Sequence, residues 1–233
     1  MKLTIIIPAH NEEEVLEKTV VSIIDYLKTK DYEILICNDH STDKTLELAK
    51  KLSKKHKQVR YTSNTNDAGF GNALLFGFSQ AKSDLVLPMM ADLCDDPRTI
   101  PLMLEKIDEG YDIVCGSRYM KGGKKIGENA FKDFFSRLIG RICRYIIGIK
   151  TLDITNAFKM YRKSIFKNIT VEKRDFSISM EIPLKAYFKG YRITEVPTAW
   201  TTRKVGKSKF NVPKVAPSYF KIFLWALGKK IHL

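Results

Sequence analysis

The sequence predicts an α/β fold, in which a mostly parallel sheet is flanked by helices. Short apolar, β-branched runs alternate with amphipathic helical patterns up to residue 117. Runs that are apolar at every position are typical of strands buried on both faces of a parallel sheet. Three of these runs end abruptly in polar side chains, as expected at the ligand-binding edge of such a sheet.

The expected elements follow one another along the chain. Before residue 118, strands are predicted at residues 3–8, 33–37, 59–62, 85–87 and 111–116, and helices at residues 15–27, 46–52, 70–81 and 100–109. After it come a basic helical stretch at 128–149, strands at 153–162 and 191–201, a basic loop at 204–213 and an aromatic-rich helix at 219–227. Strand–helix–strand units connect parallel neighbours by right-handed crossovers. The first half should therefore carry the main part of the sheet.

The chain is strongly basic, with 40 lysines and arginines, 26 acids and a formal net charge of +14. This excess indicates a polyanionic partner: nucleic acid, an anionic membrane surface or a phosphate-bearing substrate. The four cysteines form no Cys-x-x-Cys pair, which argues against a zinc site or disulfide framework and favours a reducing, cytoplasmic setting. A strand-like run occupies the place of a signal peptide, and no apolar stretch approaches the roughly 18 residues of a membrane span. We expect a protein that can lie on a membrane without crossing it.

Polar side chains follow three of the predicted strands, at residues 8–12, 38–39 and 90–92. Because adjacent parallel strands place their carboxyl ends on one edge, these groups can face one ligand. Asp92, directly at a strand end, is expected to bind Mg²⁺ or Mn²⁺ together with substrate phosphates. Asp95 and Asp96 either join it or cap the next helix, with Pro97 in the first turn.

Two common phosphate-binding motifs are missing from the sequence. No Gly-x-Gly-x-x-Gly follows the first strand, and Gly-x-x-x-x-Gly-Lys-Ser/Thr occurs nowhere. These absences argue against a dinucleotide oxidoreductase and a P-loop NTPase. The short Gly69-Phe70-Gly71 segment favours a tight turn into a helix rather than a phosphate cradle.

Several segments together resemble a known family. They are IIIPAHNEE (5–13), EILICNDHSTDKT (33–45), GFGNALLFGFSQAKSDLVLPMMADLCDDP (69–97), GSRYMKGG (116–123), DITNAFKMYR (153–162) and RKVGKSKF (203–210). In this order they resemble glycosyltransferase family 2, and within it the polyprenyl-phosphate (dolichol-phosphate) mannose and glucose synthases. The resemblance implies a GT-A fold, which is a single Rossmann-like domain that binds a nucleotide-diphosphate sugar and a divalent metal.

The resemblance also implies that residues 1–233 form one domain whose two halves have different roles. Residues 1–117 would bind the nucleotide sugar, and residues 118–233 would face the acceptor and the membrane. The implied reaction is the inverting transfer of a hexose to a polyprenyl or dolichyl phosphate. Mannose from GDP-mannose is favoured, and glucose from UDP-glucose is the alternative donor.

Site residues carry over from the family position by position. The donor site would comprise Pro8, His10, Glu12, Cys37, Asp39, Met90, Ala91, Asp92, Arg203 and Lys209. Asp92 would hold the metal, with Cys94 at the position of a further ligand and Asp95 as a substitute, and Arg118 would bind the acceptor phosphate. Asp92, Arg118, Arg203 and Lys209 would be the catalytic set. Met90 stands where the family has an acid, which leaves one motif carboxylate and puts metal dependence in question.

The net charge fits a membrane-facing surface. In the helical stretch at 128–149, the apolar side chains fall near one helical face and basic side chains are interleaved with them. The apolar residues are Phe131, Phe134, Phe135, Leu138, Ile139, Ile142, Tyr145 and Ile146. A second such segment spans residues 219–230. Both have the composition of amphipathic helices at a lipid interface, and the alternative is that each simply covers the sheet. We expect a peripheral protein on the cytoplasmic face of a membrane.

The expected reaction needs no strong general base. A phosphate oxyanion is already ionised at neutral pH, so the site must chiefly position the reactants and stabilise the leaving diphosphate. The alternatives are a family 2 enzyme with a soluble acceptor, an inactive sugar-nucleotide-binding protein and a nucleic-acid-binding protein. The last explains the charge, but its acids lie where a phosphate backbone would be repelled.

Overall fold

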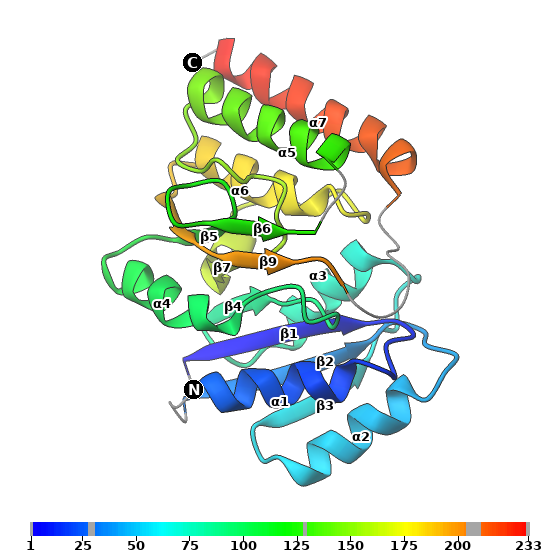
Figure 1. The fold of residues 1–233 in the computed structure, drawn as a ribbon. Helices are drawn as coiled ribbons and strands as arrows, with labels where there is room; N and C mark the ends of the chain where they lie inside the picture. The colour runs from blue at the N-terminus through cyan, green and yellow to red at the C-terminus, as the bar shows by residue number, and fades with distance from the viewer. Residues whose placement is uncertain (1, 28–30, 128–129, 204–210, 232–233) are drawn as a thin grey trace.

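The computed structural model describes residues 2–27, 31–127, 130–203 and 211–231. The main sheet contains β1 (Leu3–Ala9), β2 (Tyr32–Asn38), β3 (Val59–Ser63), β4 (Leu85–Pro88), β5 (Ile113–Ser117), β7 (Lys159–Arg162) and β8 (Ile193–Pro197). Its order is β3-β2-β1-β4-β7-β5-β8 (Figure 1). Among these described strands, only β7 is antiparallel to its neighbours. The predicted mostly parallel sheet is confirmed.

Helices cover both faces of this sheet. One face carries α1 (Leu16–Tyr26), α2 (Thr45–Lys55) and α4 (Ile100–Asp108), and the other carries α3 (Phe70–Gln80), α5 (Ala130–Ile142), α6 (Ile178–Phe188) and α7 (Val212–Ile231). Within β1, Ile5 and Ile7 pack into the first core and Ile6 into the second. The alternation of side chains along a strand explains why apolar residues occupy consecutive positions of β1, and the one hydroxyl there, that of Thr4, is hydrogen-bonded to Glu33.

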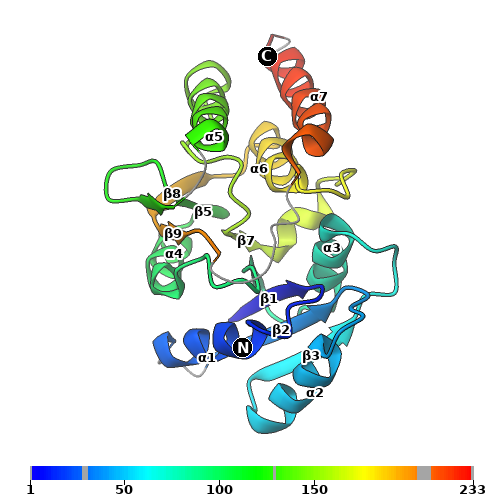
Figure 2. The same ribbon diagram turned by 45° about the vertical axis from the view of Figure 1, so that its right-hand side comes forward.

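The part of the chain after residue 117 adds two smaller features. A two-stranded parallel sheet pairs β6 (Lys124–Ile126) with β9 (Ala199–Thr201). Helices α5 and α7 lie at the end of the molecule far from α2, and Figure 2 shows them standing apart with α6 between and beneath them. A π-helical turn, Cys143–Ile147, continues α5 and ends at Gly148, whose φ is +97°.

The expected strand at 153–162 is wrong in its first half. Only β7 forms, because the side chains of residues 151–156 bond to nearby backbone instead of leaving it to a ladder. The Thr151 hydroxyl accepts from the Asp153 amide, and the Asn156 side chain accepts from the Phe158 amide while donating to the Gly116 carbonyl. Two further boundaries also differ: the segment 191–201 divides into β8 and β9, and α7 begins at residue 212 rather than 219. Most of the loop expected at 204–213 lies outside the described residues.

Candidate active site

The three polar strand ends meet at one edge of the sheet. β1 lies between β2 and β4, with Ala9 opposite Asn38 and Ile6 opposite Pro88. The chain leaves β1 in different directions to reach these two neighbours, and such a switch point is where open α/β sheets bind ligands. The predicted convergence of residues 8–12, 38–39 and 90–92 is therefore confirmed.

Backbone strain is concentrated just beyond the same strand ends. Among the described residues other than glycine, positive φ angles occur at Asn11 (53°), His40 (53°) and Leu93 (60°). These residues follow β1, β2 and β4 respectively. Left-handed backbone costs free energy in residues with a side chain and is found at functional sites. The chain thus adopts a left-handed conformation just beyond each of the three strands that meet at this edge.

Asp39 connects several segments at this edge of the sheet. Its carboxylate oxygens accept hydrogen bonds of 2.9 Å from the Asn64 side-chain amide and from the Gly69 backbone amide. The ring Nδ1 of His10 lies within hydrogen-bond distance of the Asp39 carbonyl oxygen. Gly69 has a φ of +142°, a conformation that favours glycine, and it begins α3. The Gly-x-Gly segment therefore serves the turn and the Asp39 contact.

Arg203 connects two strand ends across the site. Its Nη2 lies 3.0 Å from both carboxylate oxygens of Glu12, and its Nε lies 3.5 Å from Oδ2 of Asp92. Burial opposes the charge of this guanidinium, but the Glu12 contact outweighs burial and raises the pKa of Arg203. A permanent cation is thus held between two acids that line the same cavity.

The turn after β4 separates the three acids by role. Asp96 caps the 3₁₀ turn Pro97–Thr99 by accepting from the Arg98 amide at 3.0 Å. Asp95 is buried, and its Oδ2 accepts from the Met90 amide at 3.1 Å. Burial, followed by the nearby charge of Asp92, raises the pKa of Asp95 to about 7. The capping alternative therefore holds for Asp96, and Asp95 stabilises the turn.

The side chains around Asp92 offer few ligands to a divalent metal. Asp92 lines the cavity described below, and its Oδ1 accepts from the Cys94 amide at 3.1 Å. Burial raises the pKa of the Cys94 thiol, so this residue offers a neutral sulfur instead of a hard oxygen. No group of three or more metal-binding side chains occurs among the described residues. One carboxylate with substrate phosphates and water fits Mg²⁺, which is commonly held in this way.

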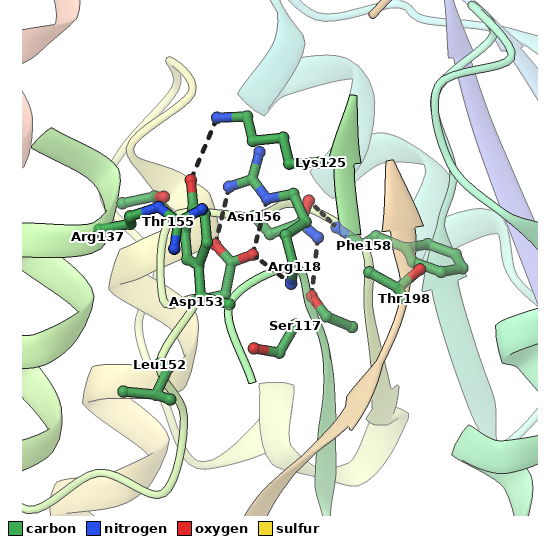
Figure 3. A network of polar contacts seen from close by, with 12 residues as sticks. Ser117, Arg118, Lys125, Arg137, Leu152, Asp153, Thr155, Asn156, Phe158 and Thr198 are labelled. Atoms are coloured by element: carbon green, nitrogen blue, oxygen red, sulfur yellow. Dashed lines mark hydrogen bonds and ion pairs between the residues drawn. The ribbon is translucent and has the colours of Figure 1, made fainter. Parts of the chain in front are cut away.

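Arg118 forms a bidentate ion pair with Asp153 (Figure 3). Its Nε and Nη2 donate to Asp153 at 2.7 and 2.8 Å, and its backbone amide donates to the same carboxylate at 2.9 Å. Asp153 is fully buried. Burial alone would raise the pKa of Asp153, but its contacts with Arg118 reverse this effect and lower it. Asp153 therefore fixes both the position and the orientation of the guanidinium.

A cavity of about 1540 Å³ joins these features. At one end it is lined by strand-end residues, including His10, Glu12 and Asp92, and Arg118 lines its wall. At the other end it is lined by apolar residues of α5 and α7 and of the segment that leads to α6: Phe135, Leu138, Ile139, Phe176, Val215, Phe220 and Phe223. A polar anion site thus opens directly into an apolar cleft.

Most of the predicted site residues meet in this cavity, with clear exceptions. Pro8, Asp39 and Met90 line it with those already named. Cys37 is fully buried, and its thiol lies 3.3 Å from the Ala73 carbonyl oxygen, so its side chain belongs to the core. Ala91 and Asp95 are also buried and do not line the cavity, and the Ala91 carbonyl oxygen accepts from the Thr19 hydroxyl. Lys209 lies outside the described residues.

Sequence reasoning missed several residues of the cavity wall. They are Lys125, Asn156, Ser179 and Trp200, together with Asp153 behind Arg118. None of these residues follows one of the three polar strand ends. The local signal that would have revealed Asp153 and Asn156 is their position in a short polar stretch before β7, which was interpreted as strand.

These observations define the protein as a Rossmann-like α/β protein whose ligand site lies at the carboxyl edge of its sheet. Residues 4–170 match the family model for glycosyl transferase family 2, and the chain belongs to this family. Its expected GT-A fold is confirmed by similarity to glucosyl-3-phosphoglycerate synthase from Mycobacterium tuberculosis, solved with Mn²⁺ and UDP. The TM-score is 0.72 at 16% identity, over 97% of this chain and 80% of that one.

Two curated relatives are similar over nearly the whole of this chain. Dolichol-phosphate mannosyltransferase of Pyrococcus furiosus is 36% identical over 91% of the chain, and the chain spans 60% of that protein's length. Polyprenol monophosphomannose synthase of Mycolicibacterium smegmatis is 27% identical, over 97% of this chain and 88% of the relative. Among the residues that the structure describes, no helix is both long and apolar enough to span a bilayer.

Proposed function

We propose that this protein transfers a hexose, mannose from GDP-mannose, to a polyprenyl phosphate with inversion at the sugar carbon. The observation that carries the proposal is the continuity of one cavity from the acidic strand ends, past Arg118, into the apolar cleft between α5 and α7. An acceptor that is charged at one end and apolar along its length matches these surroundings. The names of the curated relatives support the same donor sugar and acceptor class.

In this proposal the donor lies at the edge formed by β1, β2 and β4. Asp39 and His10 lie where a base and ribose would bind, and Glu12, Asp92 and Arg203 surround the diphosphate. Residues 1–117 supply most of this half of the domain, and residues 118–233 supply the acceptor half. Lys209 remains a predicted donor contact.

The chain's own residues would drive the transfer mainly through charge and position. An acceptor phosphate oxygen forms a bond to the sugar carbon as the bond to the nucleotide diphosphate breaks, and no proton has to be removed from the ionised oxygen. Arg203 would exchange its carboxylate partners for the departing diphosphate and so stabilise the transition state. A divalent ion bound at Asp92 with the diphosphate would supply further neutralisation of the same charge.

Arg118 would hold the acceptor phosphate, because Asp153 orients its guanidinium beside the cavity. The polyprenyl chain would follow the apolar cleft. Phe134 on α5 and Phe220 on α7 are 59% and 58% exposed, which suits helices that rest in a lipid interface. We propose that the basic chain thereby docks on an anionic membrane from the cytoplasmic side.

The test is to incubate the purified protein with GDP-mannose, a polyprenyl phosphate and Mg²⁺ or Mn²⁺, and to identify the lipid product by mass spectrometry and NMR. A mannosyl phosphate with the anomeric configuration opposite to the donor is expected. If only UDP-glucose gave a product, UDP-glucose would replace GDP-mannose as the assigned donor. Donor binding without transfer to any acceptor would instead indicate an inactive sugar-nucleotide-binding protein, the interpretation that Met90 supports.

A further inference from the structure

A second cation, Lys125 of β6, lies in the wall of the same cavity. Its side chain is only 5% exposed, and its Nζ lies 3.1 Å from Oδ1 of Asp133 and donates to the Tyr119 hydroxyl at 3.1 Å. Burying an ammonium group is costly unless it is paired, and here Asp133 supplies the pairing. The side chain is therefore held in a defined place beside the cavity.

Lys125 and Arg118 share the same two aromatic rings. The Arg118 guanidinium carbon lies 5.1 Å from the Tyr119 ring centre and 5.9 Å from that of Trp200. The Lys125 ammonium lies 5.6 Å from both. Figure 3 shows the two cations next to each other, with Arg118 nearer to Asp153. Aromatic faces attract cations without neutralising them, so the rings gather two positive charges at one place.

Lys125 does not have its carboxylate partner to itself. Asp153 offsets Arg118, whereas Asp133 is shared between Lys125 and Arg137, the latter at 2.6 Å. Arg137 also lies over the Tyr119 ring, 4.5 Å from its centre. Asp133 is thus divided between two cations rather than held by Lys125 alone. A phosphate monoester carries more than one negative charge at neutral pH, and the Arg118–Asp153 pair alone offers no net charge to balance it.

We propose that Lys125 is a second acceptor-phosphate-binding residue, which exchanges Asp133 for a phosphate oxygen while Arg118 binds another. The assignment rests on the proposed function, since it names a group that binds that function's acceptor. It also gives Asp133 a role as the counter-ion that occupies Lys125 until the phosphate arrives. Because Asp133 belongs to α5, the exchange releases an ion pair that ties this cleft helix to the small sheet.

The test uses farnesyl phosphate as the acceptor and Lys125→Gln as the variant, with exposed Lys124→Gln on the same strand as the matched control. Loss of a charge-assisted contact should raise the acceptor KM about tenfold or more, while the donor KM stays within about twofold of wild type. The direct dissociation constant for farnesyl phosphate should rise in parallel. A Lys125→Gln variant that matches Lys124→Gln in both measurements overturns the assignment.

A second variant separates binding from a merely structural bridge. If Asp133 competes with the phosphate for Lys125, Asp133→Asn should tighten farnesyl phosphate binding, and the gain should vanish in the double variant with Lys125→Gln. A bridge needed only for packing predicts weaker binding in Asp133→Asn, which would overturn the proposal. If the wild type neither binds nor glycosylates farnesyl phosphate, the proposed function fails and the assignment fails with it. If the wild type binds and glycosylates farnesyl phosphate, the measurements on the variants alone decide whether Lys125 binds the phosphate.

Discussion

Asp92 lines the cavity and lies beside Arg203, and in our proposal it holds the metal and the donor diphosphate. Asp92→Asn should lower kcat/KM by at least about a hundredfold, since it removes the charge that would hold the metal and diphosphate. The melting temperature should change little, because the Cys94 amide can still donate to the side-chain oxygen of the substituted residue. Asp96→Asn, which keeps an N-capping side chain, is the control and should stay active. Full activity of Asp92→Asn would remove the metal assignment.

A substitution at Met90 tests the same site by adding a carboxylate instead of removing one. It lines the cavity beside Asp92, where an acid would add a second carboxylate for a divalent ion. Met90→Asp should therefore lower the Mg²⁺ or Mn²⁺ concentration needed for half-maximal activity by about tenfold. Titrations of the two metals in the presence of donor give this value. An unchanged titration would show that residue 90 does not approach the ion.

Asp95 gives the stability of the protein a pH dependence of known sign. Its pKa is raised to about 7 in the folded state, whereas an unfolded aspartate titrates near about 4. Between these values the folded chain keeps a proton that the unfolded chain has lost, so this group's contribution to stability falls as the pH rises and then levels off above about pH 7. Asp95→Asn cannot titrate and still offers an oxygen to the Met90 amide. Thermal melts in a chelating buffer should show the variant gaining stability relative to wild type between about pH 5 and pH 8. A constant difference at both pH values would contradict this.

At the scale of elements, α5 and α7 carry the proposed membrane contact. Vesicles containing anionic lipid should sediment the protein, and the bound fraction should fall as salt rises, because each basic side chain near the surface contributes about 1 kcal/mol that salt screens. Replacing Phe134 and Phe220 by Ser should weaken binding at every salt concentration. Leu102→Ser on α4, also an exposed apolar position, is the control. Binding that ignores both salt and the paired substitution would exclude these helices as the contact.

The elements also show how far the sequence predicts this fold. The five strands before residue 118 were predicted to within one or two residues. In β1, β2, β4 and β5 every residue is buried and most are apolar, whereas β3 is partly exposed and mixes apolar with polar side chains. The strand expected at 153–162 failed in its first half because local side-chain bonds of Thr151 and Asn156 replace the ladder. Such bonds depend on partners such as Gly116, which lies 40 residues away in the chain.

In the candidate site too, residues that directly follow a strand could be predicted, whereas residues brought together by distant parts of the chain could not. Asp39, Asp92 and Glu12 were predicted because each follows a recognisable strand, so topology alone brings them together. Lys125 and Trp200 come from two short strands that pair only in the folded chain. Their spacing in sequence contains no sign of a shared cavity.

At the scale of the whole molecule, the central claim is that one cavity joins a nucleotide-sugar site to an apolar acceptor cleft. The direct test compares kcat/KM for three acceptors with the same donor: a polyprenyl phosphate, the corresponding polyprenol and the soluble phosphate ester 3-phosphoglycerate. Both halves of the acceptor should be needed, since the phosphate meets Arg118 and the chain fills the cleft between α5 and α7. We expect efficient transfer to the polyprenyl phosphate and at least about a hundredfold less to either of the others. Equal or better transfer to 3-phosphoglycerate would contradict the claim and show that the cleft does not select the acceptor.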